Sequence, residues 1–322
     1  MRLSILAFGA SVLAGSQQSS FAGKWQELAP IPIAPRSEQT TVALSDSTIA
    51  ILGGITAGGK GGGSPPTTDM MQLYNVTDNS WRLGPKIPVP LNHLNVAAVD
   101  GKIFLLGGHA VLPNGTWSAI PNSWMLDPAQ GEWKPIAPMP NGTARAACAT
   151  AVYGKTIYLA GGQTLNVPGV YQNSGGSQKE GDHVGGSIVG TTLYVIGGRH
   201  FGRKNVRNTV FTLDLNRPDD DWKEDPSKLP TARGGISIAT IAKKIYVFGG
   251  EGNPAEGSDG IFNQTEAFDT VTRKWTTLAP MKLPRHGTSA AVTQGCAFLP
   301  GGSTVEGGPP VNYTDRFCPD NQ

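Results

Sequence analysis

Six short apolar runs along the chain each end in a pair of glycines: AILGG, FLLGG, YLAGG, YVIGG, YVFGG and FLPGG. The pairs begin at Gly53, Gly107, Gly161, Gly197, Gly249 and Gly301, in steps of 54, 54, 36, 52 and 52 residues. A repeat of about 50 residues with such a strand is typical of a β-propeller, in which each repeat forms one four-stranded blade. The pattern therefore predicts an all-β fold with six blades.

One period shows the order of strands within a repeat. Residues 40–44, 48–54, 70–75 and 80–84 are short strand-like stretches separated by turn residues and by one glycine-rich loop. The last two alternate apolar and polar side chains, as half-buried strands do. We name these strands a to d, and the loop that leads into each strand a is the d–a loop.

Tryptophans mark strand d in most repeats. Four of them lie 24 to 27 residues after the second glycine of a pair, and the set is Trp25, Trp81, Trp133, Trp222 and Trp275. A large ring at one fixed position of a repeat is expected to pack against the neighbouring blade. Trp117 and Trp124 lie outside this series.

The ends of the chain complement each other. The last glycine pair is followed by no tryptophan, and Trp25 is preceded by no strands of its own blade. We therefore expect the N-terminal segment 24–28 to supply strand d to a last blade whose other strands come from residues 288–318. Closing the ring in this way removes exposed sheet edges.

The third repeat is short. Only 21 residues separate Gly162 from the next d–a loop at His183, against 35 to 39 in the other repeats, and none is tryptophan. The sequence predicts a truncated third blade without strand d. Either that blade has three strands or the chain has lost coding sequence, and the exposed edge that a missing strand leaves favours the second explanation.

The N-terminus predicts export. Residues 1–22 have the form of a signal peptide, with Arg2, an apolar run from Leu3 to Ala14 and small residues before Gly23. We expect residues 23–322 to form the propeller domain, although a cut near Gly15 stays open. Five N-x-S/T sequons predict a secreted glycoprotein: Asn75, Asn114, Asn141, Asn263 and Asn312. No later apolar run reaches the roughly 18 residues of a membrane span.

The cysteines and the net charge narrow the picture further. Cys296 begins strand b and Cys318 ends strand c of the last blade, so antiparallel pairing allows a disulfide between them. Cys148 is expected to be a buried thiol. A net charge of +2 without a Lys/Arg run argues against nucleic-acid binding, and we expect a monomer.

Strand order places the d–a and b–c loops on one face, and all five histidines fall there. His93, His183 and His286 lie in d–a loops, whereas His109 and His200 directly follow glycine pairs. This face is expected to form a polar pocket for an anion or a polar small molecule, with His93 and His183 as catalytic acid–base candidates. The ligand-binding candidates are Arg36, Arg145, Arg199, His200, Arg233, Glu251, Arg285 and His286, and Asp182 and Glu180 lie on the same face.

Two alternatives limit this interpretation. An arginine that recurs in several d–a loops could simply hydrogen-bond loop carbonyls around the ring. No two histidines have a short ligand spacing such as H-x-H, and no cysteine lies beside them, so we expect no metal and no cofactor. A metal site assembled from different blades stays open, because sequence spacing does not reveal it.

The glycine pairs, the d–a arginines and the strand-d tryptophans over residues 24–318 resemble the secreted kelch-type β-propeller proteins of filamentous fungi. Galactose-oxidase-like copper enzymes also have kelch repeats, but their site needs a Cys–Tyr crosslink and a Tyr-His pair. This chain has no Tyr-His dipeptide, Tyr171 is its only loop tyrosine of note, and the extra domains are absent. A periplasmic sialic-acid epimerase is similar in architecture alone. In length and signal the chain is similar to kelch-like proteins that accompany oxidases in polyketide biosynthesis, that of terrein among them.

Two functions follow from this resemblance and from the one-sided polar residues. The first is binding of a small oxygenated metabolite and assistance of a non-redox step in fungal polyketide biosynthesis, with a secreted oxidase as a candidate partner. An enzyme of this kind would be an isomerase or epimerase rather than a copper oxidase. The second is a non-enzymatic module that binds glycans or proteins. The repeat itself does not decide between them, since propellers host unrelated chemistries.

Overall fold

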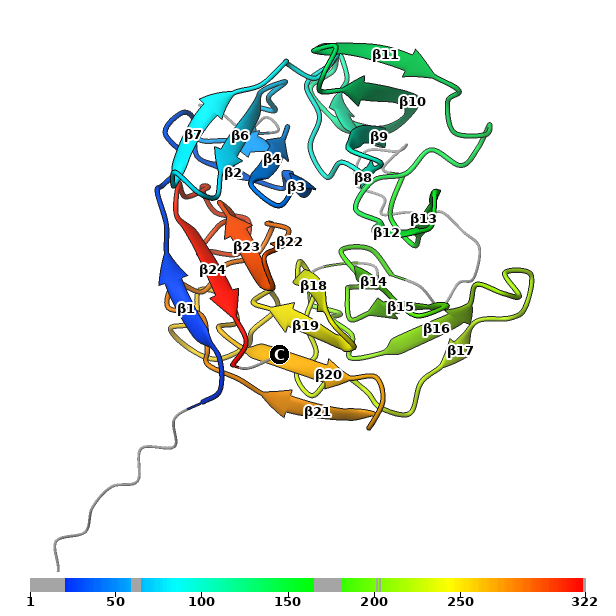
Figure 1. Ribbon diagram of the computed structural model, residues 1–322, viewed down its shortest axis with the longest axis vertical. Coiled ribbons are helices and arrows are strands. Elements are labelled where there is room, and N and C mark those ends of the chain that lie inside the picture. The colour runs from blue at the N-terminus through cyan, green and yellow to red at the C-terminus, as the bar shows by residue number, and fades with distance from the viewer. Residues whose placement is uncertain (1–20, 59–64, 165–180, 201, 203, 321–322) are drawn as a thin grey trace, which may run out of the picture.

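The computed structural model describes residues 21–58, 65–164, 181–200, 202 and 204–320 of the 322-residue chain. These ranges form 24 strands and no helix, and the sheets are arranged around a common centre (Figure 1). Within them, no helix is long and apolar enough to cross a bilayer. The all-β class is confirmed. The predicted signal peptide falls almost wholly on residues 1–20, outside the described residues.

The first four-stranded sheet follows the order expected from one repeat. It pairs β3 (Thr40–Ser45), β4 (Thr48–Leu52), β6 (Met71–Asn75) and β7 (Ser80–Leu83), antiparallel and in chain order. The strands β4 and β6 are largely buried, whereas β7 is mostly exposed. Two short strands, β2 (Arg36–Ser37) and β5 (Ile55–Thr56), pair at the loop end of this sheet. The four strands expected from the sequence are therefore confirmed.

Three further sheets repeat this arrangement. Their strands are β8 (Val96–Val99), β9 (Lys102–Val111), β10 (Trp117–Asp127) and β11 (Glu132–Ile136); β14 (Gly185–Val189), β15 (Thr192–Ile196), β16 (Val210–Asp214) and β17 (Lys223–Glu224); and β18 (Ser237–Ile241), β19 (Lys244–Phe248), β20 (Thr265–Asp269) and β21 (Lys274–Thr277). The long hairpin β9–β10 continues past its glycine pair, with a shift of register between Ile120 and Ser123. His109 therefore lies within β9 and not in a loop, which corrects the expectation from the sequence.

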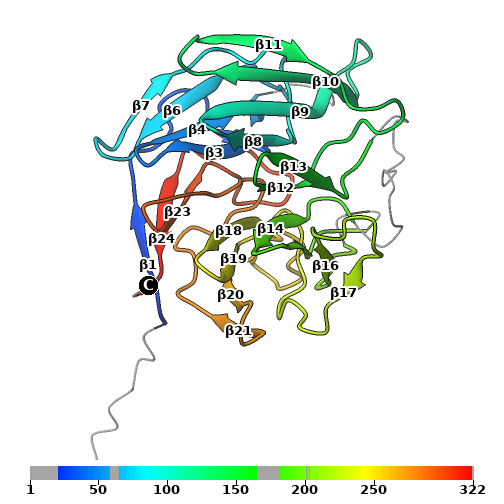
Figure 2. The ribbon, with the colours of Figure 1, turned by 45° about the vertical axis from the view of Figure 1, so that its right-hand side comes forward.

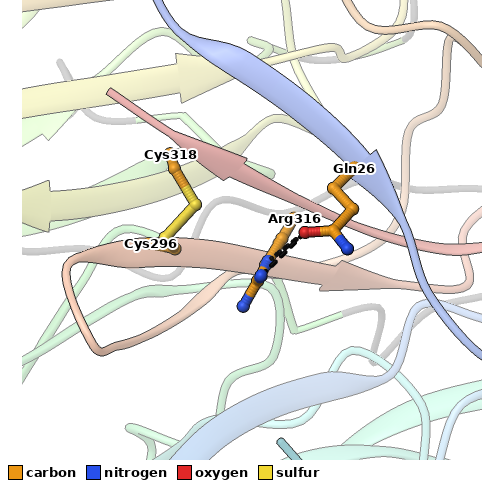
Figure 3. The surroundings of a disulfide bond; sticks show 4 residues. All are labelled: Gln26, Cys296, Arg316 and Cys318. Carbon is orange, nitrogen blue, oxygen red and sulfur yellow. Dashed lines mark hydrogen bonds between the residues drawn. A yellow bond between two sulfur atoms is a disulfide. The ribbon is translucent and has the colours of Figure 1, made fainter. Parts of the chain in front are cut away.

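The fifth four-stranded sheet combines both ends of the chain. Its order is β1 (Lys24–Glu27), β24 (Thr314–Cys318), β23 (Cys296–Pro300) and β22 (Ala291–Thr293). Cys296 and Cys318 lie at facing ends of two antiparallel strands and form a disulfide (Figure 3), as predicted. Beside it, Arg316 donates two hydrogen bonds to Gln26 Oε1, at 2.9 and 2.7 Å, across β24 and β1.

The third repeat contributes a two-stranded sheet, β12 (Ala149–Tyr153) and β13 (Thr156–Ala160). The sequence predicted that this blade lacks strand d, and the segment that bears on this prediction, residues 165–180, lies outside the described residues. Cys148, just before β12, is half-buried and outside the disulfide, with its thiol 3.6 Å from the Gly161 carbonyl oxygen.

The first strands of the six repeats lie innermost and neighbour one another in a closed order (Figures 1 and 2). This order is β3, β8, β12, β14, β18, β22 and again β3. The apolar core lies between neighbouring sheets: Leu52 packs with Leu105 in one cluster, and Trp25 packs with Phe248 and Phe317 in another. The sheets therefore bury their faces against each other around a common axis.

Four of the strand-d tryptophans tie their sheet to the preceding one. Trp25, Trp81 and Trp275 donate through Nε1 to the carbonyl oxygens of Ala279, Ala29 and Ser227, at 2.8, 2.9 and 2.9 Å. Trp133 makes the same kind of contact with Pro85 O at 3.4 Å. The structural role expected for these four rings is confirmed.

Close backbone approach explains the glycine pairs. A Cβ atom at Gly249 would lie 2.2 Å from Arg285 O, and one at Gly301 would lie 2.4 Å from Arg36 O. Both glycines also have a positive φ, of 54° and 71°. Only glycine fits such a position without strain, so the pairs allow each sheet end to contact the d–a loop of the next sheet.

Candidate functional site

A closed ring of backbone hydrogen bonds surrounds the centre of the molecule at the d–a loops. Each member donates its N–H to the carbonyl oxygen of the member before it, over 2.6 to 3.3 Å, and the first donates to the last. All six have φ between 51° and 60°, the left-handed region. The members of this loop ring are Glu38, His93, Ala147, His183, Gly235 and Gly287. The loops thus place one residue per repeat at the same radius.

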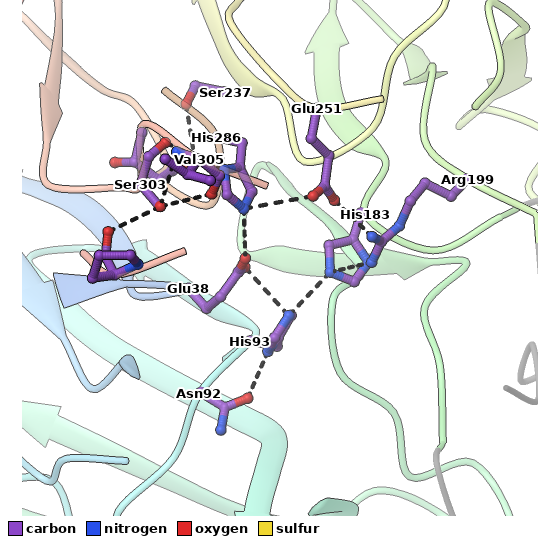
Figure 4. Close-up of polar contacts among 12 residues, drawn as sticks. Glu38, Asn92, His93, His183, Arg199, Ser237, Glu251, His286, Ser303 and Val305 are labelled. Carbon is purple, nitrogen blue, oxygen red and sulfur yellow. Dashed lines mark hydrogen bonds and ion pairs between the residues drawn. The ribbon is translucent and has the colours of Figure 1, made fainter. Parts of the chain in front are cut away.

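Three members of the loop ring carry reactive side chains, and these converge (Figure 4). His93 Nε2 lies 3.3 Å from Glu38 Oε2 and 3.0 Å from His183 Nε2. Side chains of this kind cost backbone strain in the left-handed region, where glycine is favoured. Ala147 also lies in this region, so four of the six ring members retain strain, and the convergence of the three reactive side chains points to a functional site.

The outer nitrogen of each histidine faces an oxygen. His93 Nδ1 lies 2.5 Å from Asn92 Oδ1, and His183 Nδ1 lies 2.5 Å from Asp182 Oδ1. A carboxylate only accepts, so Nδ1 of His183 carries the hydrogen; the Asn92 amide nitrogen bonds Thr67 Oγ1 at 2.9 Å, which leaves its oxygen for His93. In the neutral rings both Nε2 atoms then present lone pairs to each other. Two lone pairs 3.0 Å apart would repel, so either a proton or a metal ion between the nitrogens would stabilise this contact.

Arg199 and two carboxylates border the histidines. Arg199 bonds Glu251 Oε1 at 2.6 Å and Asp182 Oδ1 at 3.2 Å, and its NH2 lies 2.8 Å from both ring nitrogens of His183. Burial favours a lower pKa for Arg199, but the charges of Glu251, Asp182 and Glu38 outweigh it and raise the pKa. Burial alone would raise the pKa of Asp182. Its hydrogen bonds and charge interactions with His183 and Arg199 outweigh burial and lower this pKa to about 2.

His286 completes the cluster from the last d–a loop. Its Nε2 lies 3.5 Å from Glu251 Oε2 and 3.9 Å from Glu38 Oε1, and its Nδ1 lies 3.2 Å from the carbonyl oxygen of Ser303 (Figure 4). Burial, with the charges of His183 and Arg199, holds the pKa of His93 well below its usual 6.5. The cluster therefore places His93 among carboxylates and one guanidinium.

A central cavity of about 520 Å³ opens from this cluster. Glu38, His93 and His183 line it, and small apolar side chains of the innermost strands, such as Ala98 and Val292, form much of its wall. A cavity with one polar end and apolar walls can hold a small molecule that is partly oxygenated and partly hydrocarbon.

The predicted arginines of the d–a loops lie elsewhere. Arg233 donates to Gly249 O at 2.7 Å and pairs with Glu266 at 2.5 Å, and Arg285 pairs with Asp315 at 2.5 Å. Arg36 and Arg145 also bond the carbonyl oxygens of first glycines, those of Gly53 and Gly161. These contacts are of the kind expected if the arginines hold loop carbonyls, the alternative left open by the sequence.

Of the other predicted residues, Arg199, Glu251 and His286 lie in the cluster, and His200 lies in the β15–β16 loop, where its backbone bonds Asn205. Glu180 falls outside the described residues. His109 is buried beside the cluster, its ring 5.4 Å from that of His93, and burial lowers its pKa well below 6.5.

Sequence reasoning missed Glu38, Asn92 and Trp117, whose ring lies 5.7 Å from that of His93. A usable signal existed for Glu38. It follows Arg36 by two residues, as Gly235 follows Arg233 and Gly287 follows Arg285. Aligning the repeats on their arginines would have placed Glu38 in register with the ring positions.

The fold and this site define a kelch-type β-propeller with a polar centre on its loop face. Residues 177–320 match the KLHDC2/KLHL20/DRC7 kelch-repeats domain, and residues 90–140 match the kelch motif. Kelch-like protein terF of Aspergillus terreus is 35% identical over 98% of this chain and 72% of its own length. The chain belongs to the kelch-like family and is similar to this fungal protein, as its motifs suggested.

More distant relatives share the repeat. Kelch-like protein 15 of Danio rerio and that of Homo sapiens are 27% and 26% identical over 74% of this chain, which spans 42% and 43% of their lengths. The solved structure titled "Structure of YjhT" superimposes with a TM-score of 0.71 at 15% identity, covering 92% of this chain and 98% of that one. That likeness supports the propeller fold alone.

Proposed function

We propose that the central cavity binds a small oxygenated metabolite, with its oxygens at Glu38, His93 and His183 and its hydrocarbon part against the apolar walls. The observation that carries this proposal is that the largely buried cluster of Glu38, His93 and His183 lines the cavity of about 520 Å³. The arginine contacts described above leave Arg199 as the guanidinium nearest to such a ligand.

The metabolite class follows from the family resemblance. Similarity to kelch-like proteins that accompany oxidases in polyketide biosynthesis supports a polyketide intermediate and a non-redox conversion of it, such as an isomerisation or ring rearrangement. His93 and His183 would contact the reacting part of the ligand, and a secreted oxidase would supply or consume it.

We further propose a monomeric secreted glycoprotein whose six blades are closed by β1. The pairing of β1 with β24 and the cyclic order of innermost strands support the ring. Four sequon asparagines are exposed: Asn114, Asn141, Asn263 and Asn312. Glycans there would hinder a large partner more than a small ligand, which favours the metabolite over a glycan or protein.

Binding is tested by titrating the purified protein with candidate polyketide intermediates while recording tryptophan fluorescence, because Trp117 lies beside His93. We expect saturable quenching that weakens at least tenfold in Glu38→Gln. The control is Glu132→Gln, an exposed glutamate on β11. Equal affinities in wild type and Glu38→Gln would refute binding at this site, and product profiles with a partner oxidase, with and without the protein, test turnover.

A further inference from the structure

The three converging side chains of the loop ring form a ligand set that no short sequence spacing indicated. The ligating atoms of Glu38, His93 and His183 all lie within 4.8 Å of one another. They come from three different repeats, so only the closed ring brings them together.

The spacing of these atoms suits a single metal ion. Ligands at about 2.1 Å from a tetrahedral ion are about 3.4 Å apart. The observed separations are 3.0 Å between the two Nε2 atoms and 3.3 Å between His93 Nε2 and Glu38 Oε2. These two separations are therefore close to the edge length of such a coordination shell, and the third pair, Glu38 and His183, lies within 4.8 Å.

The surroundings of the histidines match those of metal ligands. A metal-binding imidazole usually donates its other N–H to a carboxylate, an amide or a backbone carbonyl, which fixes the ring and its tautomer. Asn92 and Asp182 provide these acceptors, each at 2.5 Å from Nδ1. The two Nε2 atoms are thereby left 3.0 Å apart, and Arg199 NH2 lies 2.8 Å from that of His183.

The net charge of the cluster is negative and would be balanced by a divalent cation. Its carboxylates are Glu38, Asp182 and Glu251, and its one guanidinium is that of Arg199. With neutral imidazoles the sum is a charge of −2. Arg199 lies close to His183, but its own charge is covered by Asp182 and Glu251, with which it forms ion pairs.

We propose that Glu38, His93 and His183 bind one divalent transition-metal ion of the class that prefers imidazole, with its remaining positions open to the cavity. Two imidazoles and a carboxylate are a common set for zinc and non-haem iron, and an open position is typical of a site that acts on a ligand. The ion would act as a Lewis acid toward an oxygen of the bound metabolite. The ion would be the group that binds an oxygen of the metabolite, so this inference rests on the proposed function. Metal binding itself can be tested without any metabolite.

The test uses chelator-treated, purified full-length protein and the metals Zn²⁺, Co²⁺ and Fe²⁺ alone. We expect one tightly bound ion per chain by calorimetry, and visible absorption of the Co²⁺ form that Zn²⁺ abolishes. His93→Gln and Glu38→Gln should weaken binding by at least a hundredfold, and Asn92→Ala by 10- to 100-fold because it orients His93. Glu132→Gln, the exposed control, should bind as wild type. The metal that binds most tightly shows which divalent ion of this class the site prefers.

Two results would overturn the metal site. One is the absence of stoichiometric binding to the wild type, which would mean that a proton bridges the two Nε2 atoms. The other is X-ray absorption of the Zn²⁺ form without imidazole scattering, a measurement on wild type that does not depend on how the variants fold. Metal binding without quenching by any metabolite would instead count against the proposed function alone.

Discussion

Two layers of the same loops differ in what they contribute. The d–a arginines and the glycine pairs use side chain and backbone to join neighbouring sheets, and they recur with similar contacts in several repeats. The loop ring lies two residues after these arginines in four repeats, and at the matching position in the other two. It keeps φ between 51° and 60° in all six, whereas its residue varies among glutamate, histidine, alanine and glycine. The first layer forms the scaffold, and the second determines the chemistry.

The largest expected effect is on the scaffold layer. Arg233 is fully buried and bonds Gly249 O, Thr231 O and Glu266. Arg233→Ala leaves the buried Glu266 carboxylate without this partner, so we expect a loss of about 3–5 kcal/mol in the free energy of unfolding. Urea denaturation measures it, with Arg217→Ala on the exposed surface as control; a loss below about 1 kcal/mol would contradict the scaffold role.

Removing the disulfide tests the scaffold where the two ends of the chain meet. Replacing Cys296 and Cys318 by serine frees a loop of 22 residues in the unfolded chain, which should cost about 3 kcal/mol. The decrease in Tm of the double variant is compared with that of the reduced wild type. Closely similar values are expected, and an unchanged Tm in both would show that the disulfide does not stabilise this sheet.

The glycine pairs give a smaller and more local effect. Alanine at Gly249 would place Cβ 2.2 Å from the Arg285 carbonyl oxygen as well as requiring a positive φ. We expect about 2–3 kcal/mol of destabilisation, from the strain of the left-handed residue and the displaced backbone. Gly131→Ala is the matched control, since it shares the positive φ but has open space around it, and it should cost only about 1 kcal/mol. Equal losses would show that close approach is not the reason for glycine.

The scaffold layer was predictable from the sequence because it repeats. The strands at 40–45 and 71–75, the tryptophans and the disulfide all follow from periodic or antiparallel patterns. For the site, the sequence predicted only the face of the propeller on which the polar residues lie. Which histidines meet depends on a backbone ring between distant repeats, and His109 was misplaced because β9 extends beyond its glycine pair.

Glu38 and Asn92 were missed for a related reason. Glu38 lies in another repeat and becomes a partner of His93 only when the loops are brought side by side. Asn92 directly precedes His93, but an asparagine at that position does not by itself indicate that its side chain bonds the imidazole. For Glu38 the signal appears only when the repeats are aligned on their loop arginines, and not in the sequence around it alone. The repeat fixes the backbone of each ring position, however. Once the repeats are aligned, the sequence therefore shows which side chain each ring position carries.

The most direct test of the separation between scaffold and site is the free energy of unfolding of His93→Gly, measured by urea denaturation beside Arg233→Ala. Glycine relieves the positive φ of residue 93 and retains the backbone ring, so we predict a change within about 1 kcal/mol of zero together with loss of ligand binding. A loss of stability as large as that of Arg233→Ala would contradict the account, because His93 would then be part of the scaffold.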